Sequence, residues 1–100
     1  MKTILNKPVL CADGFRMSVQ ANETAYCSPR ASNANRYEEV EVGFPSHEEP
    51  LLLDYADDPS KPTDTVYARV PVQVVTNVIA KHGGMLEGEV PAGVPTLWAN

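Results

Sequence analysis

The chain has 100 residues, of which 43% are hydrophobic and 21% are charged, and this composition predicts one folded domain with a modest core. Its formal net charge of −5 argues against direct binding to nucleic acid or to an anionic membrane, because phosphate repels such a surface. The longest strongly apolar runs, such as residues 70–75, are far shorter than the roughly 20 residues that cross a bilayer.

The first 21 residues predict a β-hairpin. Residues 3–10 predict an edge strand, because Pro8 has no N–H to donate to a sheet ladder. Asp13 and Gly14 predict a tight turn, since glycine readily adopts the positive φ of such turns. Residues 15–21 then alternate between apolar and polar side chains, which predicts a half-buried strand that pairs with the first. Its apolar side carries Phe15, Met17, Val19 and Ala21.

A loop and a second alternating strand follow. Residues 22–36 are polar and without periodicity, and they predict a long exposed loop. Residues 37–44 alternate again and predict a strand that ends at Pro45. The side expected to be buried carries Val40, Val42 and Phe44, and the opposite side carries Glu39, Glu41 and Gly43.

Three short segments lead to the helix. Residues 51–55 are apolar and predict a largely buried strand or helical turn. Residues 56–64 are acidic and contain two prolines, which predicts a rigid loop. Residues 65–70 are β-branched and aromatic and predict a strand.

One helix is predicted between Pro71 and Gly83. Proline suits the first helical turn, where its missing N–H is not needed. Gly83 and Gly84 predict the end of the helix, because glycine is the preferred residue just past a helix C-terminus. The residues that recur at helical spacing are Val72, Val75, Val78, Ile79 and His82.

Together these elements predict a small α+β fold, with a largely antiparallel sheet of about four strands and one C-terminal helix packed on it. The domain is expected to span residues 1–84. Residues 85–100 are expected to form a proline-containing tail that either packs as an extended segment or hangs free. The candidate anchors of this tail are Leu86, Leu97 and Trp98.

No catalytic signature is recognised. The candidate ligands of a zinc site are Cys11, Cys27, His47 and His82. Because their separations of 16, 20 and 35 residues include no close pair, we expect two buried thiols in a reducing cytosol and two surface imidazoles. Cys27 has no identifiable base, and Glu39 and Glu41 fit the solvated face of a strand better than a catalytic pair. We therefore predict no catalytic residue, no metal and no cofactor, and expect that the protein is not an enzyme.

The acidic residues are concentrated in one part of the chain. Nine of the thirteen fall between Glu38 and Asp64, where Lys61 is the only basic residue, so this stretch carries about −8. Such a field favours a partner protein with a basic surface, although solvated loops and imitation of a nucleic acid are alternative interpretations. The residues predicted to bind the partner are Glu38, Glu39, Glu41, Asp54, Tyr55, Asp57 and Asp58.

Four segments, 11–21, 26–30, 40–45 and 62–67, resemble a family of small uncharacterised bacteriophage and prophage proteins. Their sequences are CADGFRMSVQA, YCSPR, VEVGFP and PTDTVY. The resemblance covers most of residues 1–84 and implies a location in the cytoplasm of an infected bacterium. Small acidic phage proteins without catalytic motifs resemble, as a class, binders that block host proteins, including anti-CRISPR inhibitors.

The leading hypothesis is therefore a phage-encoded protein-binding module that inhibits or redirects a host protein. One alternative is a structural or accessory virion protein, which would self-assemble. The other alternative is a small thiol-dependent or metal-dependent enzyme.

Overall fold

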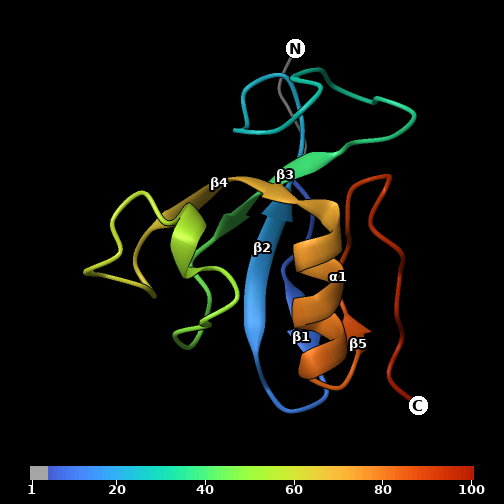
Figure 1. The fold of residues 1–100 in the computed structure, drawn as a ribbon. Helices are drawn as coiled ribbons and strands as arrows, with labels where there is room; N and C mark the ends of the chain where they lie inside the picture. Colours follow the sequence, from blue (N-terminus) through green and yellow to red (C-terminus); the bar gives the residue numbers. More distant parts are fainter. Residues whose placement is uncertain (1–4) are drawn as a thin grey trace.

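The computed structural model describes residues 5–100, which form one antiparallel sheet with a single helix packed against one of its faces (Figure 1). The strands of the sheet lie in the order β4-β3-β2-β1-β5. Their bounds are β1 (Val9–Cys11), β2 (Arg16–Gln20), β3 (Glu39–Gly43), β4 (Val66–Pro71) and β5 (Met85–Glu87). The predicted α+β class with one C-terminal helix is confirmed.

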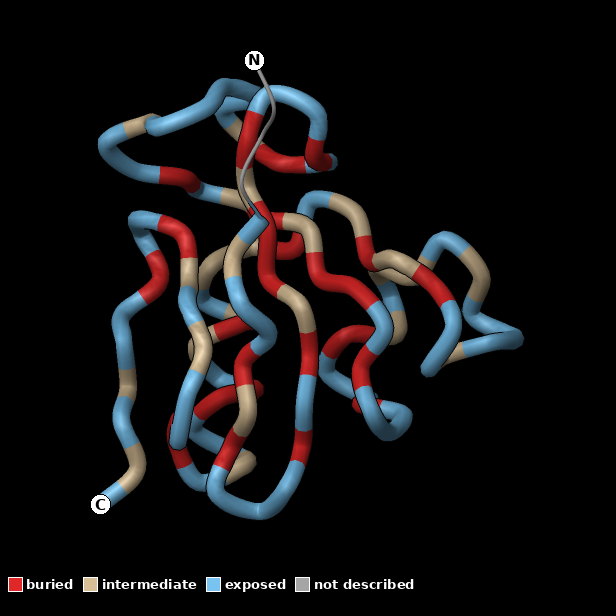
Figure 2. The backbone as a smooth tube through the Cα atoms, turned by 180° about the vertical axis from the view of Figure 1, so that it is seen from behind, coloured by how far each residue is buried: buried red, intermediate tan, exposed pale blue. Residues whose placement is uncertain are grey.

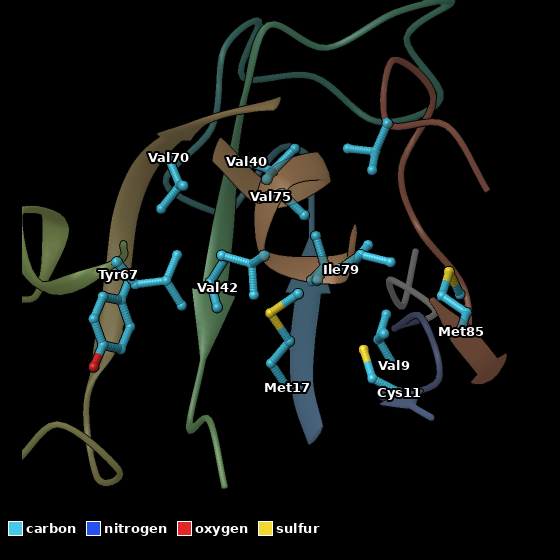
Figure 3. Close-up of a cluster of buried hydrophobic side chains, with 14 of the residues drawn as sticks. Val9, Cys11, Met17, Val40, Val42, Tyr67, Val70, Val75, Ile79 and Met85 are labelled. Carbon is cyan, nitrogen blue, oxygen red and sulfur yellow. The ribbon is translucent and has the colours of Figure 1, made fainter. Parts of the chain in front are cut away.

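The helix α1 (Val72–Lys81) lies across the sheet because apolar residues recur along one of its sides. Val75, Val78 and Ile79 have no exposed surface and face the strands. Figure 3 shows Val75 and Ile79 beside Met17 and Val42, with Tyr67 at one end of the cluster and Met85 at the other. The core therefore lies between α1 and one face of the sheet.

The predicted hairpin is formed by β1 and β2, with Val9 opposite Met17. Strand β1 is shorter than predicted, because it begins only after Pro8, whose ring nitrogen cannot donate. Upstream of β1, the side chain of Gln20 bonds to the backbone of Asn6. Its Oε1 accepts from the Asn6 N–H at 2.8 Å, and its Nε2 donates to Asn6 O at 2.9 Å. Residues 3 and 4 of the predicted strand lie outside the described residues.

Phe44 was expected beside Val42 in the core, and this prediction is wrong. Its side chain is 58% exposed, and its backbone has a left-handed φ of 48°. The Phe44 N–H donates to Thr65 O at 3.0 Å, where the chain leaves β3, and this turn directs the side chain outward. The next residue, Pro45, is buried instead.

Two other burial predictions need correction. In the segment 51–55, only Leu52 is buried; Leu51 is 44% exposed, and the short 3-10 helix η1 (Leu53–Tyr55) has no buried residue. The loop 22–36 is less exposed than predicted, because Asn22, Ala25 and Cys27 are buried in it. Its other residues are mainly exposed (Figure 2), and the loop extends beyond one end of the strands, at the top of Figure 1.

The last sixteen residues pack as an extended segment. Strand β5 pairs with β1, and the chain then returns so that Met85 bonds to Leu97 and Ala99 at 2.7 and 2.8 Å. Of the predicted anchors, Leu97 is half-buried against the core, whereas Leu86 and Trp98 are 57% and 58% exposed. The buried apolar side chains of this segment include Met85 and Val94. This segment thus covers the β5 edge of the sheet.

Candidate functional site

The predicted partner-binding residues lie in two separate groups. In the antiparallel pair of β3 and β4, Glu39 lies opposite Pro71 at one end. Asp57 bonds through its N–H to Val66 O at the other end. Five residue steps of β4 span about 16 Å. The predicted acids therefore divide into the β3 group (Glu38, Glu39 and Glu41) and the loop group (Asp54, Asp57 and Asp58). Asp64 was not among the predicted residues, but it precedes Thr65, to which the Asp58 N–H donates, and it is counted with the loop group from here on.

The β3 group is partly neutralised. Glu38 is exposed, but Glu39 lies 3.9 Å from the guanidinium of Arg69, and Glu41 accepts a hydrogen bond from the Tyr26 N–H at 3.1 Å. Arg69 occupies a bulge in β4 with φ 50°, and its N–H bonds to Tyr26 O instead of β3. This end of the sheet consequently presents a mixed surface rather than a purely acidic one.

In the loop group, Asp54, Asp57 and Asp64 are exposed and Asp58 is half-buried, and hydrogen bonds within the loop hold its backbone in place. Asp58 accepts from the Ser60 N–H and hydroxyl at 3.1 and 2.6 Å, and its own N–H donates to the Thr65 hydroxyl at 3.0 Å. Lys61 N–H donates to Asp58 O, and Asp64 N–H to Lys61 O. These bonds fix the backbone that carries the carboxylates. The remaining predicted residue, Tyr55, is half-buried against the core.

Glu49 is the member of the acidic stretch that the structure removes from the surface. It is only 1% exposed. Its carboxylate accepts hydrogen bonds from the Leu51 N–H at 2.8 Å and from Lys81 Nζ at 2.9–3.0 Å. A buried charge needs such partners, because removal from water is otherwise strongly unfavourable.

His82 connects Glu49 to the hairpin. Its Nε2 lies 2.7 Å from Glu49 Oε1, and its Nδ1 lies 2.6 Å from Asp13 Oδ2. The ring stacks on Phe15, with 4.1 Å between centroids and 11° between planes. The expectation of a surface imidazole at position 82 is wrong, because this side chain is only 16% exposed. His47, by contrast, is exposed.

Both carboxylates of this cluster have lowered pKa values. For Glu49, burial acts to raise the pKa, but the hydrogen bonds from Leu51, Lys81 and His82 outweigh it and hold the pKa below the ordinary value. For Asp13, the hydrogen bond from the Phe15 N–H is the largest cause of the lowered pKa, followed by the hydrogen bond to His82. Both groups are therefore carboxylates at neutral pH.

Within residues 5–100, the two cysteines are poorly placed as nucleophiles and no metal centre is assembled. Cys11 and Cys27 are free and buried, and burial followed by the charge of Asp13 raises the pKa of Cys11 to about 11. Such a thiol stays protonated and is a poor nucleophile. Within residues 5–100, no three His, Cys, Asp or Glu side chains converge as ligands. Asp13 and Glu49 contact different nitrogens of the His82 ring, so the ring separates their carboxylates and the two do not point at a common metal position.

An open pocket of about 570 Å³ lies beside β5. Trp98 and Leu86 form its apolar part, and its charges balance because two bases face two acids. Its lining residues are Lys7, Pro8, Arg16, Leu86, Glu87, Gly88, Glu89 and Trp98. Trp98 and Leu86, which the sequence predicts to be packing anchors, thus line an open pocket.

None of the helices in residues 5–100 has the length and the apolar character needed to span a bilayer.

Comparison with protein-family models, curated proteins and solved structures finds no match to this chain. The resemblance to small phage proteins therefore remains a prediction that rests on the four sequence segments.

Proposed function

We propose that this protein is a phage-encoded binding module that inhibits a host protein in the bacterial cytoplasm by covering one of its basic surfaces. The observation that carries the proposal is the loop group, whose carboxylates extend from a backbone that is already hydrogen-bonded. A preorganised loop loses little further conformational entropy when a partner binds it. This favours a surface built for association over a solvated loop without a role.

Exposed apolar side chains in the same stretch support the proposal. Phe44 and Leu51 are 58% and 44% exposed, and the backbone of Phe44 bonds to Thr65, the residue that follows Asp64. Interfaces commonly combine a few large apolar anchors with a polar rim. We expect Phe44 to enter an apolar pocket of the partner while the carboxylates of the loop group meet its lysines and arginines.

The arrangement of ionisable groups agrees better with binding than with catalysis. Both nitrogens of His82 are engaged by carboxylates, so this ring has no free nitrogen with which to move a substrate proton. Cys11 has no exposed surface. We therefore place the activity in stoichiometric binding.

The test is capture of a partner from bacterial lysate by the immobilised protein, followed by association kinetics with the purified partner. We expect association to slow as salt rises, because steering between exposed charges is screened beyond about 8 Å at physiological ionic strength. The variant Asp54→Asn/Asp57→Asn should associate several-fold more slowly. Within the described structure, the carboxylates of Asp54 and Asp57 take part in no side-chain hydrogen bond, so the folding of this double variant should be unaffected.

The matched control is Glu23→Gln/Glu87→Gln, which makes the same change in net charge at exposed positions outside the acidic stretch. It should associate at the wild-type rate. Equal rates for both double variants, with no dependence on salt, would move the interface away from the loop group. The predicted alternative surface is then the loop 22–36 with Tyr26 and Arg30, whose guanidinium lies 5.7 Å from the Tyr26 ring.

A further inference from the structure

The segment 44–52 links β3 to η1 and contains no strand or helix of its own. Besides its bonds at the two ends, it is fastened to the body of the protein at two interior points. Ser46 exchanges hydrogen bonds with Arg16, at 2.7 Å to its O and 2.9 Å from its N–H. The other point is Glu49, which reaches the end of α1 and, through His82, the β1–β2 turn. We propose that Asp13, His82 and Glu49 form a proton-dependent latch that holds segment 44–52 against the end of α1.

The number of protons in the latch follows from its geometry. A carboxylate can only accept a hydrogen bond, and a neutral imidazole has one donor nitrogen and one acceptor nitrogen. Both ring nitrogens of His82 lie within 2.7 Å of a carboxylate oxygen, and two such contacts are both hydrogen bonds only when both nitrogens donate, as they do in an imidazolium. The closed latch therefore contains one more proton than a neutral histidine would supply.

The charges around the ring balance only in this form. Asp13 faces it from the β1–β2 turn and Glu49 faces it from segment 44–52. Lys81, the neighbouring residue on α1, supplies a second positive charge to Glu49. Phe15 covers one face of the ring and carries no charge. Loss of the ring proton would leave two carboxylates against one ammonium, with a nitrogen lone pair directed at a carboxylate oxygen.

The consequence is a segment whose attachment depends on pH. Histidine is the side chain whose ordinary charge change falls between about pH 5 and 8, so a single proton can decide whether such a bridge exists. The latch should open on the alkaline side when His82 loses its proton, and on the acidic side when the carboxylates gain theirs. The lowered pKa of Asp13 has the hydrogen bond from the Phe15 N–H as its largest cause and the bond to His82 as its second. Burial acts to raise the pKa of Glu49, and the hydrogen bonds from Leu51, Lys81 and His82 hold it down.

This inference goes beyond the proposed function, and its test uses the unmodified protein without a partner. The ring nitrogens of His82 and His47 are followed by ¹⁵N NMR from pH 5 to 10, together with the backbone amides of segment 44–52. At pH 7 we expect both nitrogens of His82 to carry protons. When one is lost at higher pH, the amide resonances of Leu51 and Leu52 should shift with the same midpoint.

Two variants complete the test. His82→Gln should abolish the alkaline transition in the Leu51 and Leu52 amides and reduce their protection from exchange at pH 7. His47→Gln removes an exposed imidazole and should leave both unchanged. A neutral His82 ring at pH 7, or segment amides that ignore the titration of His82, would overturn the latch. The titration of the wild-type protein decides the matter even if the His82 variant does not fold.

Discussion

Glu48 and Glu49 are adjacent acids with opposite environments. Glu48 is exposed, whereas Glu49 is 1% exposed and is bonded to the Leu51 N–H, Lys81 and His82. The first contributes to the surface field, and the second joins two parts of the fold. At the scale of single residues, partners in the fold decide the role of a carboxylate, and residue type alone does not.

Replacement of Glu49 by alanine should therefore destabilise the protein. Breaking a fully buried ion pair costs about 3–5 kcal/mol, but Lys81 is 46% exposed and water screens part of its interaction, so we expect roughly 2–3 kcal/mol. Glu48→Ala is the control and should change stability by less than about 0.5 kcal/mol. Urea unfolding at pH 7 measures both, and equal midpoints for the two variants would contradict the assigned role of Glu49.

The same carboxylates predict how stability depends on acid. The pKa values of Glu49 and Asp13 are lower in the folded protein than their ordinary values of 4.5 and 3.8. The unfolded chain consequently takes up protons first, so their contribution is complete above those ordinary values and is lost as pH falls through the folded pKa values. Urea midpoints measured from pH 7 to 2 should fall on the acidic side. The urea midpoint of Glu49→Gln should fall less steeply as the pH is lowered. If its slope against pH equals that of the wild type, the stability does not depend on the protonation of Glu49.

At the scale of elements, the apolar spacing of α1 accounts for its place on the sheet. Val75, Val78 and Ile79 lie on one side of the helix and have no exposed surface, whereas Gln73 and Asn77 are exposed and bond to each other at 2.9 Å. The side that meets the strands is thus set by the sequence of the helix itself.

Val78→Asp should destabilise the protein by about 3 kcal/mol or more, because it places an unpaired carboxylate in the core. Asn77→Asp introduces the same side chain one position away on the exposed side and should be nearly neutral. Thermal or urea unfolding of the two variants measures the difference. A small effect at position 78 would mean that this side of α1 does not face the sheet.

The packing of the C-terminal segment can be tested by comparing alanine substitutions at two glycines, Gly88 and Gly14. Gly88 has φ 115°, and a Cβ there would lie 2.6 Å from Val9 Cα, whereas Gly14 has φ 95° and open space around it. Gly14→Ala should cost about 1 kcal/mol for its left-handed backbone alone. Gly88→Ala should cost roughly 3 kcal/mol, because a backbone clash is added. Similar unfolding midpoints for the two variants would show that residues near 88 do not press against β1.

At the scale of the whole molecule, both edges of the sheet are partly covered by other segments of the chain. Along β4, Val66 O accepts from the Asp57 N–H, and the Arg69 N–H donates to Tyr26 O. Beside β5, Met85 bonds to the segment that contains Leu97 and Ala99. Covered edges leave few backbone groups with which another copy could extend the sheet.

We therefore expect a monomer in solution. A monomer is compatible with the proposed binding module, whereas a virion component should self-assemble. Sedimentation equilibrium over a wide range of protein concentrations should give the mass of a single chain throughout. Defined rings or larger closed assemblies would instead support the virion alternative. A variant without residues 97–100, which exposes the β5 edge, should associate more readily than the full chain.

The sequence by itself determined the elements whose signals are local. Alternation at residues 15–21 and helical spacing at 72–82 each report one buried side, and the turn at Gly14 and the stop at Gly83 require only the conformational freedom of glycine. These signals sufficed for the α+β class and the place of the helix. The concentration of acids between residues 38 and 64 was equally visible.

Only the tertiary structure decided which charges act together. Antiparallel pairing of β3 and β4 moved Glu39 and Asp57 to opposite ends of one strand pair, although they are 18 positions apart in a continuous acidic stretch. The cluster of Asp13, Glu49 and His82 joins residues separated by 33 to 69 positions, and no periodicity records such contacts. Long-range pairing depends on how completed elements pack, because burial of a charge becomes favourable only when its partners arrive from other elements.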